Sequence, residues 1–102
     1  MKQNIKYIAT AVEWFDRVNG NSYHSVRVLR LKDNKLIKSN PVCYGYDDAY
    51  RQTALELMFE NKWLPSKYTK KDSHMFEREN KYPIYWSMTR NSRKRDMIQN
   101  VA

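Results

Sequence analysis

The pair Asn19-Gly20 lies between two runs rich in aromatic and β-branched residues, and it constrains the fold more than any other feature. Both residues tolerate the positive φ angles of a tight reversal, so the pair predicts a β-hairpin. The run before it, residues 5–15, is apolar on much of both faces, which indicates a central strand. The run after it, residues 23–31, alternates imperfectly, which predicts a bulge near Val28.

A third strand and a helix follow the hairpin. The third strand covers residues 36–42, and Pro41 places it at an edge because proline donates no hydrogen bond to a neighbouring strand. The period then changes from 2 to about 3.6, which predicts a helix that Asp47 caps and that ends before Pro65. One face of this helix carries apolar residues at i, i+4, i+7 and i+8, namely Tyr50, Ala54, Leu57 and Met58.

The rest of the chain predicts a loop, a strand and a tail. Residues 65–81 have no clean period and indicate a long loop with a short helical turn at about residues 73–78. Residues 82–89 resume strand character, and residues 90–102 form a basic C-terminal tail. The order β-β-β-α-β predicts a single α+β domain over residues 1–102, with one helix packed on one face of a small, mostly antiparallel sheet. The other face is left free for solvent, the loop or a partner.

Charge and cysteine content narrow the partners and the compartment. The net charge is +8, and it is uneven: residues 1–40 and 64–102 each carry +5, whereas residues 41–63 carry −2. A basic face attracts nucleic acid, an anionic membrane surface or an acidic protein partner, although lysines also serve simply to keep a small protein soluble. Cys43 is the only cysteine, so no disulfide forms within the chain. We expect a cytoplasmic protein without a signal peptide or a membrane span.

Several blocks of the first half resemble a group of phage proteins. The blocks are Trp14-Phe15-Asp16, residues 19–26, Tyr44-Gly45-Tyr46 and residues 52–54. Over about residues 12–57 the chain is similar to small uncharacterised proteins of tailed bacteriophages and prophages. The resemblance implies a phage-encoded protein that acts in a bacterial host. It supplies no catalytic or binding residues.

The strongest candidate for a binding site is a set of cations interleaved with aromatic residues. Cations neutralise phosphates, and exposed aromatic rings stack on unpaired bases, so the combination is typical of single-strand binding. The alternative interpretation is that Trp86 and Tyr82 belong to the core and that the lysines are solvated. The set comprises Lys67, Tyr68, Lys70 and Lys71 in the loop, Tyr85 and Trp86 on the last strand, and Arg90, Arg93, Lys94 and Arg95 in the tail.

A second row of cations lies on the hairpin. Arg27 and Arg30 are its candidate binding residues, with Lys6 and Arg17 also on the hairpin. Residues three apart on a strand face opposite sides, so Arg27 and Arg30 share a face only if a bulge realigns them.

No pattern indicates catalysis. His24 and His74 are the only histidines, and adjacent Asp47 and Asp48 suit a helix start better than a metal site. We expect His24 to be a surface or cross-strand residue, and Gly45 to be a joint that needs special dihedral angles. Cys43 is expected to be buried or half-buried and unreactive.

We therefore expect a non-enzymatic binding module with no catalytic residues, cofactor or metal. In one hypothesis its basic surface binds nucleic acid. In the other it is a phage-encoded modulator of a host protein with an acidic surface, for example a defence or replication component, and binds through the sheet face or the long loop. The oligomeric state stays open, because edge strands can pair across a two-fold axis.

Overall fold

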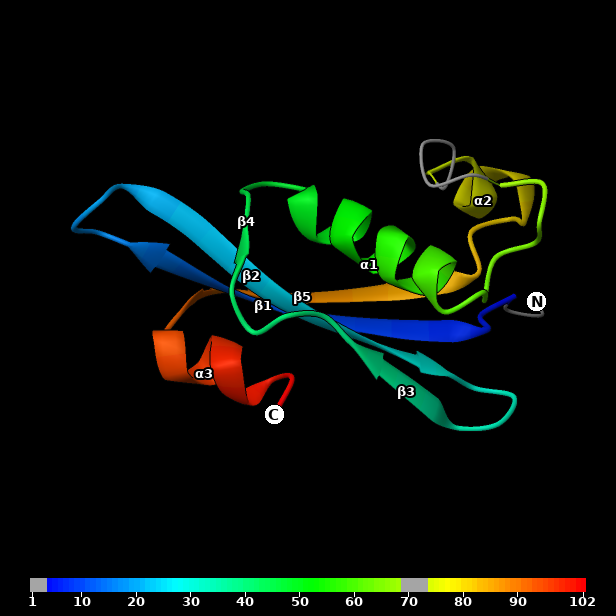
Figure 1. Ribbon diagram of the computed structural model, residues 1–102, viewed down its shortest axis with the longest axis horizontal. Coiled ribbons are helices and arrows are strands. Elements are labelled where there is room, and N and C mark those ends of the chain that lie inside the picture. The colour runs from blue at the N-terminus through cyan, green and yellow to red at the C-terminus, as the bar shows by residue number, and fades with distance from the viewer. Residues whose placement is uncertain (1–3, 69–73) are drawn as a thin grey trace.

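The computed structural model describes residues 4–68 and 74–102 and shows an α+β fold. Figure 1 shows a long twisted sheet with a helix on one side and a second, short helix on the other. The strands are β1 (Tyr7–Asp16), β2 (Asn21–Arg30), β3 (Lys35–Lys38), β4 (Cys43–Tyr44) and β5 (Ile84–Ser92), and the helices are α1 (Ala49–Glu60), α2 (His74–Glu79) and α3 (Lys94–Gln99).

The sheet has the strand order β3-β2-β1-β5, with β4 paired to β2. The predicted central position of the first strand is confirmed, because β1 lies between β2 and β5. Every pairing is antiparallel except that of β5, which runs parallel to β1 and makes the sheet mixed. The predicted third strand, residues 36–42, is too long, because β3 ends at Lys38; the separate strand β4 begins only at Cys43.

The hairpin has a longer connection than a two-residue Asn-Gly turn. Asp16 pairs with Asn21, so four residues connect β1 to β2, and among them only Gly20 has a positive φ, of 69°. The Asp16 carboxylate accepts hydrogen bonds from the backbone N–H of Val18 and from the side chain of Asn19. The predicted bulge near Val28 is wrong, because the β1–β2 register is unbroken; the irregularity lies in the β1–β5 pairing, between Val12 and Trp14.

Helix α1 covers one face of the sheet and forms the core with it. Small residues of β1, Ala9 and Ala11, let the helix approach closely. The prediction that Asp47 caps the helix is wrong: Asp48 occupies that position, and Asp47 has a φ of 58° in the connection before it. The predicted apolar stripe is confirmed at three positions, with Leu55 buried in place of the half-buried Leu57. The residues buried in this core include Val26, Val28, Tyr50, Ala54, Leu55 and Met58.

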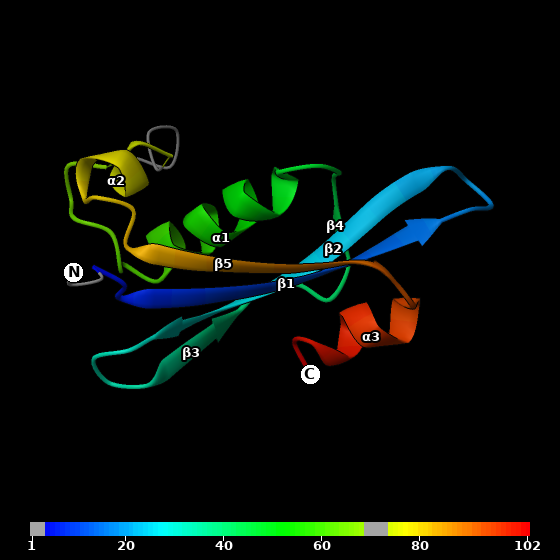
Figure 2. The same cartoon turned by 180° about the vertical axis from the view of Figure 1, so that it is seen from behind.

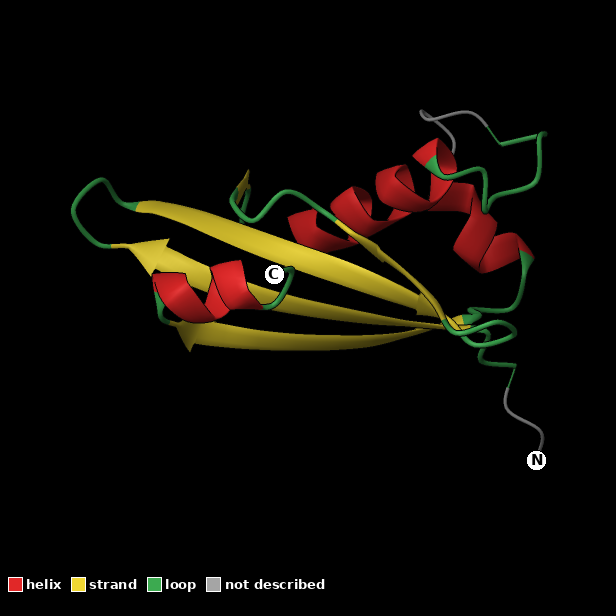
Figure 3. Cartoon of the chain, turned by 60° about the horizontal axis from the view of Figure 1, so that its bottom comes forward, coloured by secondary structure: helices red, strands yellow, loops and turns green. Residues whose placement is uncertain are grey.

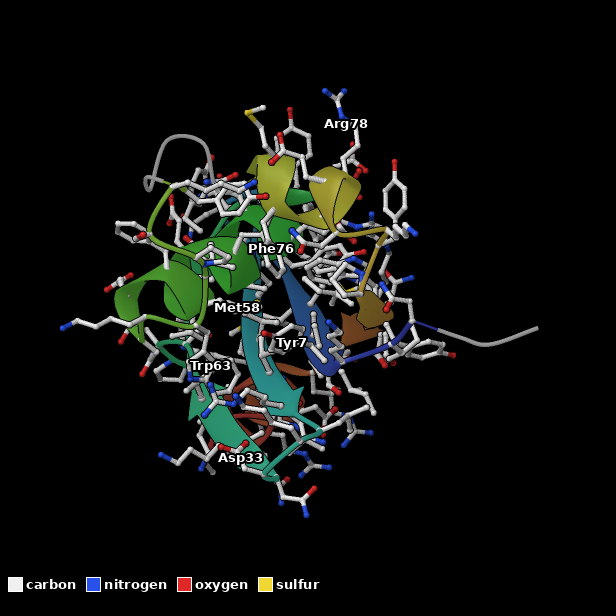
Figure 4. The ribbon with its side chains drawn as sticks, turned by 90° about the vertical axis from the view of Figure 1, so that its right-hand side faces the viewer. Tyr7, Asp33, Met58, Trp63, Phe76 and Arg78 are labelled. Carbon is white, nitrogen blue, oxygen red and sulfur yellow. The ribbon has the colours of Figure 1, made fainter. Side chains whose placement is uncertain are left out.

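The described parts of residues 65–81 are not all loop. They include α2, as the predicted helical turn anticipated. Phe76 of α2 points toward Tyr7 and Met58 in Figure 4, and its ring lies edge-on to Tyr7 with 6.2 Å between ring centroids. Arg78 points away from the core in the same view. This segment therefore extends the core at the end of the sheet where β1 begins.

The second face of the sheet is partly covered by the end of the chain. Residues 94–99, expected within a basic tail, form α3, which packs against β1 and β2 on the side opposite α1 (Figure 2). Met97 is fully buried there. Within the described residues, no helix is long and apolar enough to span a membrane.

Candidate nucleic-acid interface

Helix α3 is held under the sheet by polar side chains as well as by Met97. Ser25 Oγ donates a hydrogen bond of 2.6 Å to the carbonyl oxygen of Met97. The Asn100 amide donates to the carbonyl oxygen of Thr10 at 3.1 Å, and Arg27 donates to the carbonyl oxygen of Asn100 at 3.1 Å. These contacts join the last ten residues to β1 and β2. As a result, the cations at the start of α3 lie beside the hairpin, more than 70 residues away in sequence.

Three aromatic side chains form a row across β1, β2 and β4 on the α3 side of the sheet. Trp14 and Tyr23 face each other in the β1–β2 register, and their rings stack with centroids 5.6 Å apart and an interplanar angle of 23°. Tyr44 is paired with Tyr23, and its ring meets Tyr23 edge-on at 5.7 Å. Tyr44 is 70% exposed, so the outer end of this aromatic row faces solvent.

The cations of α3 lie next to the aromatic row. Lys94 Nζ is 5.3 Å from the centroid of the Trp14 ring, a cation–π contact. A groove of about 470 Å³ separates the end of the hairpin from the connection between β5 and α3. We name the aromatic row together with this groove and Arg95 the hairpin–α3 surface. The groove is lined by Trp14, Phe15, Asp16, Arg17, Val18, Asn91, Ser92, Arg93 and Lys94.

The carboxylates of this surface are occupied by other contacts. Asp16 accepts hydrogen bonds from Asn19, which lower its pKa, and the charge of Lys94 lowers it slightly further. Asp96 accepts a hydrogen bond from the backbone N–H of Arg93 at 3.2 Å. Among the described residues, the ion pairs involve other cations, so Arg93 and Lys94 present a positive charge that no carboxylate neutralises directly.

The structure places the candidate cations of the last strand and tail in two environments. Arg93, Lys94 and Arg95 lie on the hairpin–α3 surface and are exposed. Arg90 lies on β5 and forms a 2.9 Å ion pair with Glu13, whose side chain is largely buried. It also donates to the carbonyl oxygen of Asp47. Arg90 therefore holds β5 to the start of α1 and is less available to a ligand than the three cations that follow it.

The two described loop candidates, Lys67 and Tyr68, lie at the other end of the molecule. Tyr68 is a core residue, only 4% exposed, and its hydroxyl donates to Glu79 at 2.6 Å. Lys67 forms a 3.4 Å ion pair with the same carboxylate. Lys70 and Lys71 lie outside the described residues. The structure does not bring Lys67 and Tyr68 together with the cations of α3, because both contact α2, and α2 and α3 lie at opposite ends of the sheet in Figures 1 and 2.

The two hairpin arginines lie on opposite faces, as their spacing predicts. Arg27 is on the α3 side and donates to Asn100. Arg30 is on the α1 side, where it forms a 2.7 Å ion pair with Asp33 and lies 4.4 Å from the centroid of the Trp63 ring. The hydrogen bonds from Arg30 lower the pKa of Asp33 to about 2. Both arginines therefore have structural partners, and they do not form one patch.

The last-strand aromatics are also divided between the faces. Trp86 lies on the α1 side, where it meets Tyr50 edge-on at 5.7 Å and donates a hydrogen bond to Glu77. The core alternative is thus correct for Trp86 but wrong for Tyr82, which is 62% exposed. Tyr85 lies on the opposite face and is 59% exposed.

His24 is a buried cross-strand residue. It faces Glu13 on β1, and its Nε2 lies 2.7 Å from the Thr53 hydroxyl of α1. Burial lowers the pKa of this imidazole. Of the two expected positions, surface or cross-strand, the cross-strand position is confirmed, and the side chain is buried because α1 covers this part of the hairpin. In the described part of the chain, no three His, Cys, Asp or Glu side chains cluster closely enough to hold a metal ion.

Gly45 is the joint that its position suggested, and Cys43 is half-buried as expected. Gly45 has a φ of 141°, and a Cβ there would lie 2.6 Å from the Cβ of Ala49. The joint holds β4 against β2 and so places Tyr44 beside Tyr23. The sequence did not reveal the aromatic row, because its members lie on three strands. A two-residue Asn19-Gly20 turn would also have paired Trp14 with Ser25, whereas the four-residue connection pairs it with Tyr23.

No protein-family model matches the chain, and comparisons with curated proteins and with solved structures found no significant match.

Proposed function

We propose that this protein binds single-stranded nucleic acid on the hairpin–α3 surface. The observation that carries the proposal is the contact of Lys94 with Trp14, at the inner end of a row of three aromatic rings. Arg93 lines the same groove as Lys94 and Trp14, and Arg95 adds a further exposed cation on α3. Aromatic rings offer stacking to any base, and nearby cations neutralise the phosphates that connect successive bases.

The salt dependence of binding tests the role of the cations. Each phosphate contact contributes about 0.7 to the slope of log affinity against log salt for a single strand. Replacing Arg93, Lys94 and Arg95 by Ala should therefore reduce the slope by about 2. The matched control replaces three exposed lysines at the other end of the sheet, Lys6, Lys32 and Lys35. It removes the same charge and should leave most of the slope intact.

The role of the aromatic row is tested separately through Tyr44. The side chain is largely exposed, so Tyr44→Ala should leave the fold intact. Loss of one stacked base should weaken binding to a single-stranded oligonucleotide by about 1–3 kcal/mol without changing the salt slope. Binding to a duplex, whose bases are already stacked, should change little. Equal salt slopes for the two triple variants, or no effect of Tyr44→Ala, would refute the proposed site.

A second candidate function, the modulation of a host protein, is favoured by an apolar row on the same face of the sheet. Leu36, Leu29, Ile8 and Tyr85 are neighbours in the registers of β3, β2, β1 and β5. Leu36 and Tyr85 are exposed at its two ends. Capture of one host protein from nuclease-treated bacterial lysate, lost on Leu36→Asp, would support this function. Loss of the captured protein on nuclease treatment alone would instead favour nucleic acid.

A further inference from the structure

The outer edge of β5 is open in the described part of the structure. β5 pairs with β1 on one side only, and Figure 3 shows it as the outermost of the long strands. The N–H of Tyr7 donates to the carbonyl oxygen of Pro83, just before β5 begins. Backbone groups alternate in direction along a strand, so those of Tyr85 and Ser87 point toward β1. Those of Trp86 and Met88 therefore point to the outer edge.

The two edges of the sheet differ in how well they are protected against pairing. β3 has four residues, begins and ends with lysine, and is soon followed by Pro41. β5 has nine residues, and the six from Ile84 to Thr89 include neither a charge nor a proline. Natural proteins protect long edges with charges, prolines or bulges, because an unprotected edge pairs with another strand. The contrast within one sheet indicates that β5 is a pairing surface.

We propose that β5 pairs in antiparallel fashion with β5 of a second copy of this chain, about a two-fold axis at Ser87. In this register Trp86 of one copy exchanges backbone hydrogen bonds with Met88 of the other, which agrees with the outward direction of both groups. Tyr85 faces Thr89, and the run from Ile84 to Thr89 contains no charged residue, so no like charges meet within it. Arg90 faces Ile84, and its charge is already paired with Glu13.

The positions of the helices fit the antiparallel arrangement. α2 precedes β5 and lies on the α1 side of the sheet, whereas α3 follows β5 and lies on the other side (Figures 1 and 2). Antiparallel pairing brings α2 of one copy to the same end as α3 of the other, but on opposite faces, so the two do not collide. It also places the cations of the two α3 helices at opposite ends of the dimer, which limits the repulsion between two chains of net charge +8.

The test combines mass and hydrogen exchange on the full-length, nuclease-treated protein. Sedimentation velocity over a concentration series should give a species of twice 12.4 kDa. The substitution Ser87→Lys brings two like charges together at the axis and should weaken the dimer about tenfold or more. The control, Leu36→Lys, adds the same charge on the same face at the protected edge, and should leave the dimer unchanged.

Hydrogen exchange locates the interface independently of any variant. The backbone amides of Trp86 and Met88 should be protected at high concentration and exchange rapidly at low concentration, when the dimer dissociates. A monomer at every concentration would overturn the proposal. So would a dimer in which these two amides stay unprotected, or one that Ser87→Lys and Leu36→Lys weaken equally.

Discussion

Met97→Ala tests whether residues 94–99 are a docked helix or a loose tail. Met97 is 0% exposed, on the side of the sheet opposite the main core. Truncation of a fully buried Met to Ala costs about 2–5 kcal/mol, depending on how far the surroundings close the cavity. α3 is a six-residue helix near the end of the chain and can shift inward, so we expect a loss near the lower limit, about 2–3 kcal/mol.

Urea unfolding followed by far-ultraviolet circular dichroism measures this loss, and the adjacent residue provides the control. Ile98 is 40% exposed on the same helix. Ile98→Ala also removes an apolar side chain and introduces the best helix former, yet it opens no buried cavity, so its cost should stay below about 1 kcal/mol. The comparison isolates burial of Met97 from any change in helix propensity.

The same variant connects stability to binding. If α3 detaches in part of the population, Arg93, Lys94 and Arg95 leave the aromatic row although no cation has been removed. A loss of about 2 kcal/mol in the free energy with which α3 docks on the sheet lowers the docked fraction by at most about thirtyfold. The affinity for a single-stranded oligonucleotide should fall with that fraction. Equal unfolding free energies for Met97→Ala and Ile98→Ala would refute the docking of α3 and the geometry of the hairpin–α3 surface with it.

Three further predictions concern pH and the β4–α1 joint. The imidazole of His24 should titrate below its ordinary pKa of 6.5 in a histidine NMR titration. Because the unfolded chain takes up the proton first, the free energy of unfolding should fall as pH drops below about 6.5. This fall should be smaller in His24→Gln. An unshifted pKa would contradict the buried position. The carboxyl of Asp33 should show a pKa of about 2 in a carbon-detected NMR titration, and this pKa should return toward 3.8 in Arg30→Gln. The contribution of this carboxylate to stability is present above pH 3.8 and is lost as pH falls toward 2. Gly45→Ala should destabilise the fold by about 1–3 kcal/mol, because the new Cβ meets Ala49 and the φ is unfavourable. In the control, Gly20→Ala, the new Cβ lies in open space, so the cost in the same urea assay should be about 1 kcal/mol. Equal costs would show that the Ala49 contact does not matter.

Local patterns in the sequence sufficed for the first half of the fold. The hairpin, the central first strand and the helical stripe of Tyr50, Ala54 and Met58 all follow from turn chemistry and periodicity, which depend on neighbouring residues. The prediction of a cap at Asp47 is wrong because Gly45 and Asp47 have positive φ angles and form a connection before the helix, which begins only at Ala49. Such a joint is set by the packing of β4 on β2 and not by the residues that follow it.

The end of the chain could not be predicted in the same way. A run of Arg93, Lys94 and Arg95 resembles a solvated tail, and six residues are too few for a clear helical period. What makes α3 a helix is tertiary: Met97 fills a site on the sheet, and Asn100 satisfies the carbonyl oxygen of Thr10. A partial signal was present, since Met97 and Val101 are four residues apart and fall on one face of a helix.

The division of the predicted basic-aromatic patch follows from a strand that the sequence already indicated. Lys67 precedes β5 and Arg93 follows it, and a nine-residue strand holds its two ends about 26 Å apart. Lys67 and Arg93 therefore cannot contact the same few nucleotides, although they lie on either side of one strand in the sequence. Trp14 and Lys94 meet instead because β1 and β5 run parallel, so that the end of the hairpin's first strand lies beside the start of α3. For this reason the binding surface should be sought where parallel strands end together, and charge removal at the loop should leave it intact.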